Sequence, residues 1–121
     1  MKIEYLADAE LIRFYEFTED ERQTLVQNLR DLMTGKHASI KIHELPGVKP
    51  LEGLELTAMV GDRQKEIVPL SGNRFNWIVR PLDWEDIIEK IETLTENSKG
   101  EYQWLTDYSG IDVVFSQDGT W

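Results

Sequence analysis

The chain has 121 residues, which fits one domain. Of these residues 40% are hydrophobic, which is enough apolar surface to build a core without disulfides or a bound metal. It contains no cysteine, which excludes disulfides, thiolate metal sites, iron–sulfur clusters and cysteine nucleophiles. Its 13 basic and 23 acidic side chains give a formal charge of −10, which repels phosphate backbones and anionic membranes. We therefore expect neither nucleic acid nor a membrane as a partner.

The first residues also bear on location. Residues 1–8 contain acidic side chains where a secretory signal would need an apolar stretch, and no run of about 18 apolar residues occurs anywhere. We therefore expect a cytoplasmic protein.

The first third of the chain predicts a strand followed by a helix. Residues 11–17 carry β-branched and aromatic side chains on both alternating faces, which favours a central strand. Thr18 and Glu21 fit the capping box of a helix that runs to about Thr34, where Gly35 suits the left-handed conformation that ends a helix. One apolar stripe follows this helix and consists of Leu25, Val26, Leu29, Leu32 and Met33.

The middle of the chain predicts strands only. Four segments show alternating or β-branched residues: 38–43, 54–60, 66–70 and 75–79. Pro69 cannot donate to a ladder of hydrogen bonds, so its strand is expected at an edge or a bulge. The last three of these strands predict a meander across residues 53–80.

A second helix and a hairpin complete the chain. Asp83 is placed to cap a helix whose apolar residues recur at helical spacing: Trp84, Ile87, Ile88, Ile91 and Leu94. Strands at residues 102–106 and 111–116 follow, joined by the loop 107–110.

Together these elements predict a single α+β domain over residues 1–121. Their order is β-α-β-β-β-β-α-β-β, with a further strand at residues 2–6 as an option. Because strands outnumber helices and follow one another in hairpins, we expect a mostly antiparallel sheet of five to seven strands, with two helices packed on one face. The alternating βαβ units of a nucleotide-binding sheet are missing.

No catalytic motif occurs in the sequence. It lacks a phosphate-binding loop, the dinucleotide-binding glycine pattern, a nucleophile elbow, a paired-histidine zinc motif and a calcium loop. We therefore expect no cofactor and no metal, and we favour a protein that is not an enzyme.

The two histidines, His37 and His43, are the remaining candidates for chemistry. They are six residues apart, about 20 Å on a straight strand, which is too far to share a metal ion. We expect both to be solvated residues on an exposed face. His43 beside Glu44 is the better candidate for a general base, because a carboxylate can orient the imidazole.

Most of the negative charge lies at the end of the chain, where residues 83–121 carry two basic and ten acidic side chains. Four glutamates of the second helix fall at steps of four, three and four, which places them along one side: Glu85, Glu89, Glu92 and Glu96. Such a row is either a solvated face or an acidic stripe that steers a basic protein towards it.

Aromatic residues are concentrated in the same part of the chain. We expect Trp104 and Phe115 in the core, because they occupy alternating strand positions. Tyr108 in the hairpin loop and Trp121 have no evident packing role, so they join the glutamates as candidate partner-binding residues.

The leading hypothesis is a non-enzymatic, acidic interaction protein of the inhibitor or immunity type, whose last third binds a basic protein partner. One alternative is a small-molecule-binding protein or small enzyme with a pocket between sheet and helices, using His43 and carboxylates. Another is a structural subunit of a homo-oligomer, in which the mildly basic residues 36–82 of one copy meet the acidic third of the next.

Overall fold

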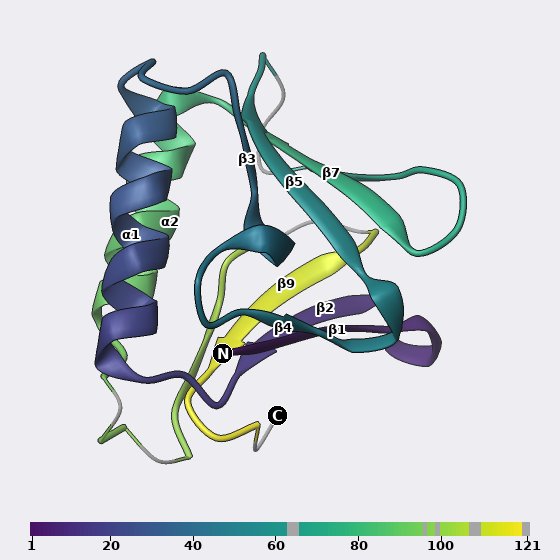
Figure 1. Cartoon of the computed structure of the whole chain (residues 1–121), viewed down its shortest axis with the longest axis vertical. Helices are drawn as coiled ribbons and strands as arrows, with labels where there is room; N and C mark the ends of the chain where they lie inside the picture. The colour runs from purple at the N-terminus through teal and green to yellow at the C-terminus, as the bar shows by residue number, and fades with distance from the viewer. Residues whose placement is uncertain (63–65, 96, 99, 107–109, 120–121) are drawn as a thin grey trace.

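A computed structural model describes residues 1–62, 66–95, 97–98, 100–106 and 110–119. Within these ranges the chain forms two α-helices, two β-sheets and three 3-10 turns (Figure 1). The strands are β1 Lys2–Leu6, β2 Leu11–Tyr15, β3 Ser39–Lys41, β4 Lys49–Pro50, β5 Glu55–Val60, β6 Glu66–Pro69, β7 Arg74–Val79, β8 Tyr102–Trp104 and β9 Asp112–Ser116. The helices are α1 Glu19–Met33 and α2 Pro81–Glu92, and the turns are η1 Ala7–Ala9, η2 Ile42–Glu44 and η3 Leu51–Gly53.

The strands form two mixed sheets, which corrects the expectation of one mostly antiparallel sheet. Sheet A has the order β4-β1-β2-β9-β8, and sheet B has the order β3-β5-β7-β6. Three pairs are parallel, namely β1 with β4, β2 with β9 and β5 with β7. The α+β class is confirmed, and the optional strand at Lys2–Leu6 is present as β1.

At the centre of sheet A, two strands from opposite ends of the chain are direct neighbours. β2 runs parallel to β9, with Phe14 opposite Phe115 and 6.0 Å between their ring centroids. β9 is buried on both faces from Val113 to Ser116, whereas on one face of β2 only Leu11 is buried and Arg13 and Tyr15 are partly exposed. The predicted central position of β2 is confirmed by the strand order of sheet A. Alternation predicts which residues are buried, but it does not predict the partner strand, and this is why the parallel pair was missed.

Sheet B corrects the predicted meander. β5 and β7 are direct neighbours in parallel, and β6 lies outside β7 as an antiparallel edge strand. The edge position predicted from Pro69 is confirmed, because a residue without an amide hydrogen is tolerated where no further strand needs a donor.

Both helices begin at residues suited to their first turn. The capping box of α1 is confirmed, because Thr18 Oγ1 accepts the Glu21 N–H at 3.2 Å and Glu21 Oε1 accepts the Thr18 N–H at 2.9 Å. Asp83 is not the cap of α2. Arg80 holds that position and Pro81 opens the helix, since the ring of proline presets the helical φ and an amide hydrogen is not needed there.

The two helices lie side by side along one side of the molecule (Figure 1). Trp84 of α2 stacks edge-on against Trp77 of β7, with 4.8 Å between ring centroids. Trp77 in turn lies 6.3 Å from Phe14 of sheet A. The helices and both sheets therefore share one hydrophobic core.

Glu21 also contacts the start of the chain. The Met1 ammonium donates to Glu21 Oε1 at 2.6 Å and to the Gly47 carbonyl at 3.0 Å. Burial raises the pKa of Glu21, but the hydrogen bonds from the ammonium and from Thr18 outweigh it, so the pKa lies below the ordinary glutamate value. The ionised carboxylate is therefore the form that stabilises the fold.

We expect Glu21→Gln to lower the free energy of unfolding at pH 7 by about 1.5–3 kcal/mol, the range of hydrogen bonds to charged groups. Glutamine retains an oxygen for the Thr18 N–H but has no charge for the ammonium. Because the pKa is lowered on folding, the stabilisation is complete above the ordinary value of about 4.3 and is lost as the pH falls through the lower value of the folded state. Urea unfolding at pH 7 and pH 3 should show the difference shrinking in acid, and an equal difference at both would contradict this origin.

Candidate functional site

The outer face of α2 carries the acidic residues predicted to meet a partner. Glu85, Glu89 and Glu92 are exposed, while four apolar residues of the helix are buried in the core, namely Trp84, Ile87, Ile88 and Ile91. Leu82, in the first turn, is 74% exposed. The steps from Leu82 through the three glutamates are three, four and three, which place all four side chains along one side of the helix. We call these four residues the α2 stripe.

The glutamates of the α2 stripe differ in their ion pairs. Glu92 accepts a hydrogen bond from Arg30 of α1 at 2.9 Å, and both side chains are substantially exposed. An exposed pair of this kind contributes about 0–1 kcal/mol, so it neutralises Glu92 without fixing it strongly. In the described part of the chain, no ion pair involves Glu85 or Glu89. These two carboxylates are the uncompensated charge of the stripe, and Glu96 lies outside the described residues.

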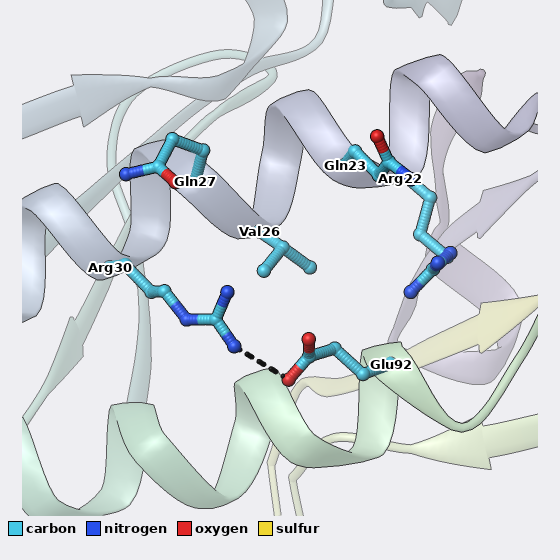
Figure 2. Close-up of a pocket in the computed structure, with 6 residues that line it drawn as sticks. All are labelled: Arg22, Gln23, Val26, Gln27, Arg30 and Glu92. Atoms are coloured by element: carbon cyan, nitrogen blue, oxygen red, sulfur yellow. Dashed lines mark hydrogen bonds and ion pairs between the residues drawn. The ribbon is translucent and has the colours of Figure 1, made fainter.

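A groove of about 320 Å³ runs between α1 and α2 beside the stripe. Figure 2 shows the side chains of Arg22 and Arg30 from α1 and of Glu92 from α2 around it. The remaining lining residues are Gln23, Val26 and Gln27. Arg22 is held by Glu19, whose pKa is lowered mainly by the hydrogen bond from that arginine. Both arginines of the groove are therefore already bound to carboxylates of the chain.

A second cleft, of about 340 Å³, lies between β1 and η3. It is lined by Glu4, Tyr5, Leu6, Leu51 and Glu52. Glu4 is bound to Arg13, whose Nε donates to it at 3.0 Å. Neither cleft lies between the sheets and the helices, where the described side chains form the hydrophobic core. The pocket predicted for a small molecule in that place stays a prediction.

His43 is not on an exposed strand face, which corrects that expectation. The strand ends at Lys41, and His43 lies in the turn η2 with its side chain only 10% exposed. Its Nδ1 accepts the Leu56 N–H of β5 at 3.0 Å. His37 is 52% exposed, as expected, and lies 4.0 Å from Asp31.

The hydrogen bond to Leu56 limits the chemistry of His43. A neutral imidazole has one lone pair, and here Nδ1 uses it, so Nε2 carries the proton. Nε2 faces Glu44 at 3.7 Å and Glu55 at 3.9 Å. His43 can act as a general base only after the bond to Leu56 breaks, and the predicted pair with Glu44 therefore stays a hypothesis.

The aromatic candidates separate into three groups. Phe115 is fully buried, as predicted. Trp104 is only half-buried on the edge strand β8, where its ring meets Tyr102 edge-on at 6.4 Å, so its predicted core position is corrected. Tyr108 and Trp121 lie outside the described residues. The exposure of Leu82 and Tyr102 was not predicted, although the helical register of Leu82 with the glutamates was visible in the sequence.

In the described residues, no group of histidine and acidic side chains is arranged to hold a metal ion. No helix in those same residues has the length and apolar character needed to cross a membrane. Comparison of the chain with protein-family models, curated proteins and solved structures found no match.

Proposed function

We propose that this chain is a protein-binding module that uses the α2 stripe to bind a basic protein surface. The observation that supports it most is that Glu85 and Glu89 are exposed and form no ion pair in the described structure. They lie on the same side of α2 as the exposed Leu82. Leu82 adds an apolar side chain that a partner can bury to a row of charges that can steer the partner towards it.

The stripe combines two contributions to binding. Burying a leucine side chain contributes about 1.5–3 kcal/mol, which makes Leu82 the anchor. The carboxylates contribute mainly to the rate of association and to the choice of partner, because complementary charge steers the encounter. The partner is then a surface with a small apolar pocket bordered by lysines or arginines. A basic toxin or nuclease, inhibited by this chain, has that chemistry.

The test is selection of ligands from a random displayed peptide library against the whole chain. We expect the selected peptides to combine lysine or arginine with an apolar residue. The double variant Glu85→Lys/Glu89→Lys should slow their association about tenfold or more at low salt. Leu82→Ala should speed their dissociation, because it removes buried apolar contact rather than charge.

The matched control is Asp8→Lys/Glu10→Lys, which changes the net charge equally at exposed positions in and just after η1, on the opposite side of the molecule from α2 (Figure 1). Its association rate should stay within about twofold of the parent rate at physiological salt, where charges beyond a Debye length are screened. Peptides without basic residues, or equal losses in both double variants, would reject the proposal.

A further inference from the structure

Strand β3 ends before it has covered the edge of β5. It pairs Ser39–Lys41 with residues 57–59, and at Ile42 the chain turns into η2. The next position along β5 is Leu56, which is fully buried. A buried amide needs an acceptor, and the ring of His43 supplies it in place of a strand.

One nitrogen of His43 faces both polar groups of Leu56. Nδ1 lies 3.0 Å from the amide nitrogen and 3.3 Å from the carbonyl oxygen of Leu56. Without a proton, Nδ1 accepts from the N–H, and with a proton it can only donate to the carbonyl. The two protonation states of the ring therefore require different hydrogen bonds to the same residue.

Two carboxylates face the other nitrogen of the ring. Nε2 faces the carboxylates of Glu44 in η2 and Glu55 in β5, which are 63% and 53% exposed. Lys41 precedes η2, and Arg74 of β7 is opposite Glu55 in the strand register. In the described structure, neither of these cations forms an ion pair with Glu44 or Glu55. A proton gained by His43 would therefore place a positive charge next to these two carboxylates.

We propose that the protonation state of His43 controls whether the turn η2 stays bound to strand β5. The neutral ring holds η2 in place by accepting the Leu56 N–H at Nδ1. Protonation of Nδ1 leaves this buried N–H without an acceptor and loosens η2, which opens the edge of β5 at Glu55 and Leu56. The fold thereby acquires a segment whose order depends on the protonation state of one imidazole ring.

The test is nuclear magnetic resonance on the whole ¹⁵N-labelled chain between pH 8 and pH 5. At pH 8 the ring nitrogens of His43 should show the tautomer protonated at Nε2. As the ring titrates, the protection of the Leu56 amide against hydrogen exchange should fall about tenfold, since protection follows the population of the closed state. Protection of Ala58, which pairs with Ile40 of β3, should change less.

His43→Asn is the matched variant, because its amide oxygen replaces Nδ1 as an acceptor and does not titrate. Leu56 protection in it should vary by less than about twofold over the same pH range. His37→Asn should retain the response of the parent chain. The proposal is overturned if Leu56 protection in the parent does not change while His43 titrates, or if His43 stays neutral until the whole chain unfolds. The same loss of protection in His43→Asn would also overturn it.

Discussion

Replacement of Trp84 by alanine should lower the free energy of unfolding by about 3–5 kcal/mol, the range for deleting a buried aromatic side chain. Trp84 is fully buried, stacks on Trp77 and donates from Nε1 to the Met59 carbonyl of β5 at 3.3 Å. It therefore links α2 to sheet B by packing and by a hydrogen bond. Because domains of this size are stable by about 5–15 kcal/mol, the variant should unfold at much lower urea concentration.

Two conservative variants separate packing from hydrogen bonding at this contact. Trp84→Phe and Trp77→Phe remove similar volume from neighbouring buried rings. In the described structure Trp77 Nε1 is buried without a partner, so Trp77→Phe also removes an unsatisfied donor. Trp84→Phe instead leaves the Met59 carbonyl without its donor, and should cost about 1 kcal/mol more. Equal urea midpoints for the two variants would mean that the bond to Met59 contributes nothing.

Gly61→Ala should lower the free energy of unfolding by about 1–3 kcal/mol, the usual effect of overpacking. A Cβ at position 61 would lie 2.4 Å from Cγ2 of Ile78 on the neighbouring strand β7. The backbone there has little freedom to move, because the Gly61 N–H donates to the Val79 carbonyl at 3.1 Å. The clash must therefore be relieved by a shift of Ile78 or of the strand.

A double-mutant cycle identifies the clash as the cause. Ile78→Ala removes the obstructing methyl group, so Gly61→Ala should cost at least about 0.5 kcal/mol less in that background. Urea unfolding of the parent, both single variants and the double variant supplies the four free energies. Strict additivity would show that the loss at position 61 has another origin.

The local elements of this fold could be predicted because their signals lie within a few neighbouring residues. The capping box at Thr18 and Glu21 and the apolar spacing of both helices reappear in the structure. Pro69 marks an edge strand, as predicted, whereas Pro81 opens the helix α2. The same residue type has opposite meanings according to which element follows it.

The residues of the candidate site also fall into those that local spacing predicts and those that only tertiary contacts bring together. The row of glutamates on α2 follows from helical spacing alone, and the structure adds that Arg30 pairs with Glu92. His43 was misjudged because alternation extended the strand by two residues, whereas the chain turns at Ile42 and carries the ring to Leu56. Such a contact joins residues that no short sequence pattern relates.

By itself, then, the sequence determined most of the core residues of the two helices, the helix boundaries to within a turn and the acidic character of the last third. Only the tertiary structure decided that β9 lies parallel to β2, that β7 lies between β5 and β6, and which carboxylates remain without a cation. The physical reason is the separation along the chain over which each interaction acts. Burial preference and capping act between near neighbours, while strand partners and ion pairs are selected by the packing of segments that meet only when the whole chain folds.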